Sequence, residues 1–181
     1  MRKIFLPLLF LLPLPALAET CPSLDAASRD AALAPHYSAL KASKNEREAF
    51  VPSDAIWEIW KKAPDAKAQA MLDVGVNQIR AGGFAGAQAA LEDLVDYCPN
   101  YAEGWNQLAY EKFLAGDREG GLVDLETTLE LLPNHFAAIA GKGLTLIRMG
   151  RTELGQNALR DALEFHPWMN ERHLLPPEEK I

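Results

Sequence analysis

Apolar side chains over residues 68–169 are spaced as on amphipathic helices, and the whole pattern recurs along the chain. One interval of 34 residues separates the members of three sets: Pro99, Pro133 and Pro167; Gly82, Gly116 and Gly150; and Leu91, Leu125 and Leu159. Because three unlike residue types keep one period, the sequence predicts three copies of one structural unit. We place these units at residues 68–101, 102–135 and 136–169.

Each unit is predicted to consist of a helix, a tight turn and a second helix. About fourteen helix-patterned residues precede each periodic glycine, which is where a helix ends in a left-handed residue. The periodic proline then closes the second helix. Positions 8 and 20 of every unit hold only small residues, which predicts that the two helices cross closely there: Gly75, Ala109 and Gly143; Ala87, Gly121 and Gly155.

This pattern resembles the tetratricopeptide repeat, a 34-residue unit with large residues at positions 4, 7 and 24, small residues at 8 and 20, and proline at 32. The resemblance covers residues 68–169, and the stretches 102–106 and 133–136 are similar to exported proteobacterial members of unassigned activity. It implies an all-α fold, an α-solenoid of antiparallel helix pairs. The third unit departs from the pattern at position 7, where we expect Lys142 to lay its stem on the core and send its charge outward.

A solenoid needs covers at its ends, because each repeat buries its apolar surface only against its neighbours. Residues 19–67 are expected to supply a tail and a degenerate helix pair, an N-terminal cap that continues the 34-residue frame backwards. Its first helix is expected over residues 24–43, with a kink or break at Pro35. Its second helix is expected to begin after a cap at Ser53 or Asp54.

The apolar stripe at residues 56–60, which contains Trp57 and Trp60, is interpreted as core that covers the first complete repeat. An exposed aromatic docking patch is the alternative. The polar segment before the stripe, residues 45–52, is predicted to be a long internal turn. The C-terminal tail, residues 170–181, is too short for another helix pair, and we expect it to fold back with Trp168 as a partial cap.

Residues 1–18 have the pattern of a cleaved signal peptide. Arg2 and Lys3 precede an apolar run that ends in the small-x-small sequence of residues 16–18. The run is shorter than the ~20 residues that cross a bilayer, and a lipoprotein anchor on Cys21 would require small apolar residues directly before it. We therefore expect a periplasmic or secreted protein with no membrane span after cleavage.

The two cysteines, Cys21 and Cys98, are separated by 77 positions, and both precede a proline. Export implies an oxidising compartment, in which a bridge would tether the N-terminal tail to the first complete repeat. The alternative is two unpaired thiols, with Cys98 packed as a small apolar residue. The sequence leaves both open.

Composition and motifs argue against several classes of function. The chain has 18 basic and 25 acidic residues, a formal net charge of −7, which disfavours nucleic acid as a partner. Its four histidines lack the spacing of a zinc site, and no phosphate-binding glycine loop or nucleophile elbow occurs. We therefore expect a non-enzymatic protein with no metal and no cofactor.

What remains is a binding surface on the first helix of each unit. The resemblance implies that positions 2, 5, 9, 12 and 13 line a concave groove, and here these positions are largely apolar. Leu72 and Val76 stand where chaperone-binding members carry the lysine and asparagine of a carboxylate clamp, which argues against such a clamp. The selected groove residues are Leu72, Val76 and Arg80; Asn106, Tyr110 and Phe113; and Leu144 and Arg148.

Two functions are compatible with this surface. In the first, the protein is a periplasmic adaptor whose groove takes a segment of another protein. Tyr110 and Phe113 would then anchor the segment, Asn106 would bond its backbone, and Arg80 and Arg148 would meet its acidic groups. In the second, the protein is a structural part of an envelope assembly, and the groove is filled either by its own chain or by a second copy in a homodimer.

Overall fold

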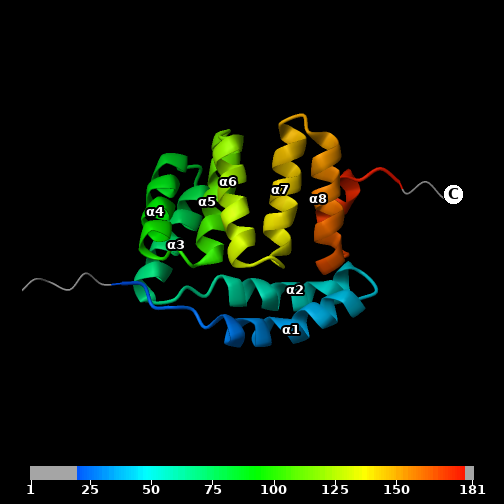
Figure 1. The fold of residues 1–181 in the computed structure, drawn as a ribbon, viewed down its shortest axis with the longest axis horizontal. Helices are drawn as coiled ribbons and strands as arrows, with labels where there is room; N and C mark the ends of the chain where they lie inside the picture. Colours follow the sequence, from blue (N-terminus) through cyan, green and yellow to red (C-terminus); the bar gives the residue numbers. More distant parts are fainter. Residues whose placement is uncertain (1–19, 178–181) are drawn as a thin grey trace, which may run out of the picture.

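The computed structural model describes residues 20–177, which form four helix pairs and a short 3-10 helix (Figure 1). In chain order the elements are α1 (Ala26–Ala42), α2 (Glu46–Trp60), α3 (Ala66–Arg80), α4 (Phe84–Tyr97), α5 (Ala102–Ala115), α6 (Arg118–Leu131), α7 (Phe136–Arg148), α8 (Thr152–Phe165) and η1 (Asn170–Leu174). The expected signal peptide, residues 1–18, lies outside the described residues. No helix of the described part is both long and apolar enough to cross a bilayer.

The pairs α3–α4, α5–α6 and α7–α8 stand side by side, and each pair corresponds to one predicted unit. Gly82, Gly116 and Gly150 end the first helices with φ values of 75°, 96° and 78°. These values lie in the left-handed region of backbone conformation, which residues other than glycine rarely adopt. The turn predicted from the periodic glycines is therefore confirmed.

The two helices of a pair approach most closely at the small residues. A Cβ atom on Gly143 would lie 2.8 Å from the carbonyl oxygen of Gly155, so α7 and α8 leave no room for a side chain there. A Cβ on Gly121 would lie 3.1 Å from the carbonyl oxygen of Ala109. The predicted helix crossing is confirmed. A glycine at the crossing has no side chain to pack, and the close contact between the two helix backbones offsets that loss.

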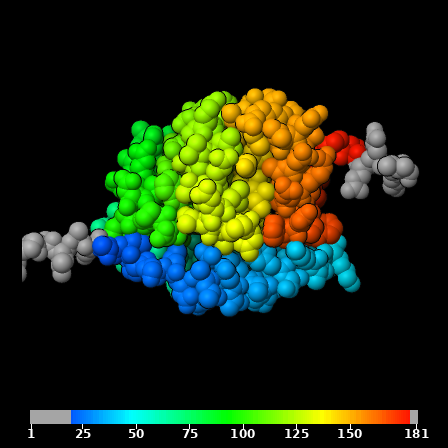
Figure 2. All heavy atoms as spheres, viewed as in Figure 1, coloured from blue at the N-terminus to red at the C-terminus, as the bar shows by residue number. Residues whose placement is uncertain are grey.

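The hairpin of α1 and α2 does not stack on the first repeat, and this part of the prediction is wrong. It lies across the ends of the repeat helices, along the lower edge of the molecule in Figures 1 and 2. Its buried residues Tyr37, Ile56 and Trp60 share a core with Ala102 and Phe136, which begin the inner helices of the second and third repeats. The stripe at residues 56–60 is therefore core, as expected, but it covers different repeats.

One hydrogen bond fixes the hairpin at the end of each repeat. At the first and third ends, a side chain of the repeat donates to a backbone carbonyl of the hairpin; at the second end the direction is reversed. The bonds run from Tyr101 Oη to the Trp60 carbonyl (2.8 Å), from Tyr37 Oη to the Asn134 carbonyl (2.5 Å) and from Trp168 Nε1 to the Ser43 carbonyl (2.8 Å).

The long internal turn predicted at residues 45–52 is absent from the described structure, because α2 already begins at Glu46. The Asn45 side chain accepts the Glu48 backbone N–H at 3.0 Å, and the Glu48 carboxylate accepts the Lys44 N–H at 3.0 Å. This arrangement is a variant of the capping box, in which the Glu48 carboxylate accepts the N–H of the residue before the N-cap. Ser53 and Asp54, the predicted caps, consequently lie inside α2.

Two smaller expectations also have clear outcomes. The helix α1 runs through Pro35 without a break, contrary to the expected interruption. Lys142 sends its Nζ atom outward to Glu126 Oε1 at 3.4 Å, as expected for a lysine at the edge of the core. After α8, Trp168 and η1 fold back against the turn between α1 and α2, so the tail covers the end of the third repeat.

Candidate binding groove

A groove with a volume of about 590 Å³ lies where the hairpin meets the inner helices of the second and third repeats. Its walls come from α2, α5 and α7 and from the segment that follows α8, and Leu125 of α6 contributes one further side chain. Its lining is mainly apolar, and its larger apolar side chains are Phe50, Trp57, Tyr110, Phe113, Phe136, Leu144, Trp168 and Met169.

Four of the predicted groove residues line this groove, namely Asn106, Tyr110 and Phe113 of α5 and Leu144 of α7. Asn106, Tyr110 and Phe113 follow one another at intervals of four and three residues, so they share one face of α5. Tyr110 is 51% exposed, which is unusual for a large aromatic side chain in the middle of a helix. Leu144 faces the same space from α7.

The other four predicted residues are not in the groove. Leu72 is only 2% exposed and packs with Ala63 in the core of the first repeat, which also contacts Val76. Arg80 and Arg148 are exposed near the ends of α3 and α7, outside the lining. Repeat position assigned these residues to a helix face, but the hairpin determines which part of that face borders a cavity.

Asn106 reaches the groove, but its amide already has a partner. Asn106 Nδ2 donates to Glu103 Oε2 at 3.2 Å, and Asn106 itself is 7% exposed. Glu103 also accepts hydrogen bonds from Gln107 Nε2 at 2.5 Å and from His135 Nε2 at 2.9 Å. One of the two side-chain N–H groups of Asn106 is therefore already engaged inside the protein, contrary to the expectation that its amide serves a ligand backbone.

His135 connects three of the segments around the groove. Its Nδ1 accepts the Ala138 N–H at 3.1 Å and so caps α7, which leaves the ring proton on Nε2 for the bond to Glu103. The ring also stacks on Trp60 of α2, with 3.7 Å between ring centroids. This buried cluster fixes α2, α5 and α7 relative to one another and thereby sets the shape of the groove.

The 34-residue pattern does not indicate the groove residues that come from outside the repeats. Phe50 and Trp57 line the groove from α2, and His166 and Trp168 line it from the segment after α8. Phe50 is 69% exposed. The capping box at Asn45 was the available signal, since it predicts that a helix, not a turn, carries Phe50.

The charged groups of the lining are acidic. Glu46, Asp54 and Glu171 line the groove, whereas the described lining contains no lysine or arginine. The hydrogen bond from Arg172 lowers the pKa of the Glu46 carboxyl below its usual range, and Arg172 lies outside the lining. Burial lowers the pKa of His166 and favours its uncharged form. Among residues 20–177, no three His, Cys, Asp or Glu side chains gather to hold a metal ion.

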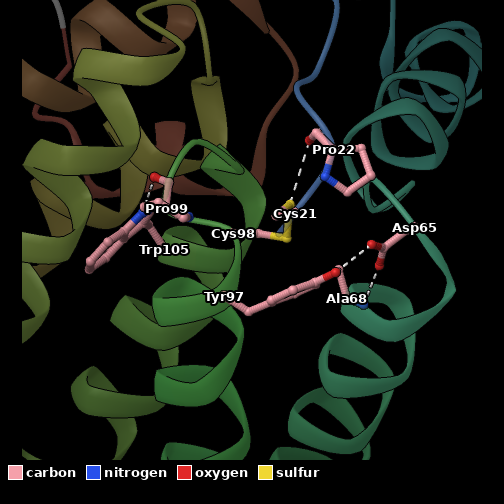
Figure 3. Close-up of a disulfide and its surroundings, with 8 residues drawn as sticks. All are labelled: Cys21, Pro22, Asp65, Ala68, Tyr97, Cys98, Pro99 and Trp105. Carbon is pink, nitrogen blue, oxygen red and sulfur yellow. Dashed lines mark hydrogen bonds between the residues drawn. A yellow bond between two sulfur atoms is a disulfide. The ribbon is translucent and has the colours of Figure 1, made fainter. Parts of the chain in front are cut away.

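A disulfide between Cys21 and Cys98 joins the N-terminal tail to the end of α4 (Figure 3). Cys98 is 1% exposed and belongs to the core of the first repeat. Beside the bridge, Tyr97 Oη donates to Asp65 Oδ2 at 2.8 Å, and the other carboxylate oxygen of Asp65 accepts the Ala68 N–H. The bridge therefore lies at a point where α3 and α4 are already tied together.

Comparison with known sequences found repeat proteins, although no protein-family model matches the chain. A TPR repeat-containing protein of Rhizobium etli is 26% identical over 90% of this chain and 83% of its own length. A tetratricopeptide repeat protein 36 homolog of Nematostella vectensis is 36% identical over 36% of each chain.

Solved structures with the same fold are also repeat proteins. The first TPR of Spaghetti (RPAP3), solved with an HSP90 peptide, gives a TM-score of 0.58 at 17% identity and covers 60% of this chain and 86% of that one. MamA gives a TM-score of 0.52 at 22% identity and covers 86% of this chain and 89% of its own. These likenesses establish the all-α solenoid fold.

Proposed function

The chain belongs to the tetratricopeptide repeat family, and from this premise we propose that it is a non-enzymatic periplasmic scaffold that holds a segment of a partner protein. The groove between α2, α5 and α7 is the proposed site. The observation that carries the proposal is the exposure of two large aromatic side chains in that groove, Tyr110 at 51% and Phe50 at 69%.

Exposed aromatic side chains in a hollow are typical anchors of protein interfaces, because they bury much apolar area and lose little conformational entropy. A buried hydrogen bond between Glu103 and His135 joins α5 to the start of α7 and so preorganises two of the groove walls. A rigid wall reduces the entropic cost of binding. That a solved protein of this fold is bound to an HSP90 peptide supports a peptide segment as the class of occupant.

The polar groups of the groove do not resemble a catalytic site. His166, the buried histidine of the lining, accepts the Trp168 backbone N–H through Nδ1 at 3.3 Å. Among the described residues of the lining, no serine or cysteine lies within hydrogen-bond distance of that ring as an activated nucleophile would. These features support a binding function.

The groove is tested by capture of a partner from a periplasmic extract with the immobilised mature chain. We expect Tyr110→Ala and Phe50→Ala to lose the proteins that the unmodified chain retains, because each removes an aromatic anchor. Val51→Ala is the matched control, since Val51 is 70% exposed on the same helix and lies outside the groove lining. Circular dichroism verifies that each variant is folded, and unchanged capture by both aromatic variants would refute the site.

The same variants separate the adaptor from a self-associating component. Light scattering after size exclusion is expected to show a monomer for the mature chain. A stable dimer that Tyr110→Ala dissociates would instead identify a second copy as the occupant.

Periplasmic location is part of the proposal and rests on residues 1–18 and on the disulfide. Disulfides persist in oxidising compartments, so the Cys21–Cys98 bridge supports export. Intact-mass measurement of the protein from cells is expected to give a chain that begins at Glu19, with no free thiol on alkylation. A chain that retains residues 1–18 with two free thiols would contradict export.

A further inference from the structure

We propose that the segment bound in the groove is basic, with apolar or aromatic side chains flanked by lysine or arginine. This inference rests on the proposed function and specifies the chemistry of its partner. It reverses the expectation from the sequence, in which Arg80 and Arg148 were to meet acidic groups of the ligand. Those two arginines lie outside the lining.

Two of the three carboxylates in the described lining, those of Asp54 and Glu171, are available to a ligand. Within residues 20–177, no hydrogen bond or ion pair engages the side chains of Asp54 and Glu171, whereas Glu46 is paired with Arg172. No lysine or arginine of the described lining offsets them, and the uncharged form of His166 is favoured by its burial. The groove therefore presents unpaired negative charge next to apolar surface.

The aromatic side chains fit the same partner. The faces of Tyr, Trp and Phe attract Lys and Arg cations that lie within about 6 Å of the ring. Tyr110 and Phe50 leave half or more of their surface exposed in this groove. A basic side chain that reaches Asp54 or Glu171 has its aliphatic stem available for contact with these rings.

Charge complementarity also disfavours the other occupants. An acidic peptide would place carboxylates against carboxylates, with no cation of the described lining to pair with them. A second copy of this chain carries the same net negative charge, −7, so the two copies repel at long range. The same field attracts a basic segment and increases its association rate.

Two synthetic peptides of one length test the proposal by fluorescence anisotropy with the mature chain. The basic probe is Gly-Arg-Leu-Phe-Leu-Arg-Gly, and the acidic probe is Gly-Glu-Leu-Phe-Leu-Glu-Gly. Because each exposed ion pair strengthens binding only modestly, we expect the basic probe to bind about tenfold more tightly at low salt. The ratio is expected to shrink at high salt because exposed charges are screened.

The double variant Asp54→Asn with Glu171→Gln removes the free carboxylates, and we expect the ratio of the two affinities to fall to about threefold or less. Asp93→Asn with Asp96→Asn is the matched control: it removes the same net charge from exposed positions of α4 and is expected to leave the ratio unchanged.

Two outcomes distinguish this inference from the proposed function. If Tyr110→Ala weakens both probes but the acidic probe binds as tightly as the basic one, the groove is correct and the inference about charge is wrong. If Tyr110→Ala changes neither affinity, the groove is not the site and both proposals fail. No binding of the basic probe at about 1 mM overturns the inference as well.

Discussion

The repeats and the α1–α2 hairpin are held in place by different kinds of contact. Within the repeats, helices meet through close backbone approach, as at Gly143 and Gly155. The hairpin is held by hydrogen bonds that its backbone carbonyls accept from side chains at the repeat ends, by aromatic ring contacts such as Trp60 on His135, and through the disulfide of the preceding tail.

The two kinds of contact also differ in the sequence separation of the residues that they join. The repeat contacts join residues within one unit or between neighbours, and they recur with the sequence period. The hairpin contacts join residues as far apart as Ser43 and Trp168, 125 positions along the chain. We therefore expect changes in the repeats to affect the whole fold, and changes in the hairpin contacts to loosen that hairpin first.

The largest expected effect is removal of the disulfide, which ties the hairpin side of the molecule to the first repeat. Cys21→Ser with Cys98→Ala opens a loop of 77 positions. In the chain-entropy model such a loop lowers the free energy of unfolding by about 4 kcal/mol. Urea unfolding measures the loss, and hydrogen exchange is expected to accelerate in α1 and α2 before α7 and α8. A loss that is equal in all helices would contradict separate docking.

The next effect comes from the closest helix crossing. Gly143→Leu places a side chain where a Cβ would already lie 2.8 Å from the Gly155 carbonyl oxygen, and we expect it to lower the free energy of unfolding by about 3 kcal/mol. Ala70→Leu on the exposed side of α3 is the control, and it is expected to be neutral or slightly stabilising. A higher melting temperature for Gly143→Leu would refute the crossing.

A smaller effect is expected at one hydrogen bond of the hairpin. Tyr101 is 3% exposed, and Tyr101→Phe removes its bond to the Trp60 carbonyl, which lowers the free energy of unfolding by about 1–2 kcal/mol. The exposed Tyr110 provides a matched control: Tyr110→Phe is expected to change stability by less than about 0.5 kcal/mol. Equal effects would show that the hairpin bond contributes little.

The smallest effect concerns a buried acid of the repeats. Glu111 is 1% exposed and neither of its carboxylate oxygens has a hydrogen-bond partner among the described residues. Burial raises the pKa of Glu111, opposed by Lys112 and assisted by Glu92, Asp117 and Asp124. Because the folded state favours the protonated form, Glu111 costs stability increasingly as pH rises above the unfolded value of about 4.3.

Glu111→Gln removes this titration. We expect a gain of about 1 kcal/mol in the free energy of unfolding at pH 7 and almost none near pH 4. Urea unfolding at both pH values gives the difference, with Glu119→Gln as an exposed control. A gain that is equal at both pH values would show that ionisation is not its cause.

The repeats were predictable because their contacts follow the period of the sequence. Three unlike residue types kept one spacing, and the left-handed glycines and close crossings lie where that spacing required them. The hairpin was predictable as two helices but not in its location. The local sequence does not indicate that the Tyr37 hydroxyl donates a hydrogen bond to the Asn134 carbonyl, 97 positions away.

The part of the groove that lies on the repeat helices was predictable from the sequence period, and the part supplied by segments outside the repeats was not. Repeat position identified Tyr110, Phe113 and Leu144, whose helices the period defines. It misplaced Leu72 and Arg80, because the cavity is closed by segments outside the repeats. The sequence contains the capping-box pattern, Asn45 followed three residues later by Glu48, and this pattern predicts that Phe50 lies on a helix.

The hairpin has a further consequence for the number of repeats. A 15-residue helix such as α2 is about 22 Å long, which matches two steps of about 8–10 Å between the packed inner helices of three repeats. Each repeat end forms one hydrogen bond with the hairpin. The length of the hairpin thus matches three repeats. A fourth repeat inserted into the chain would extend past the end of the hairpin with an uncovered apolar edge.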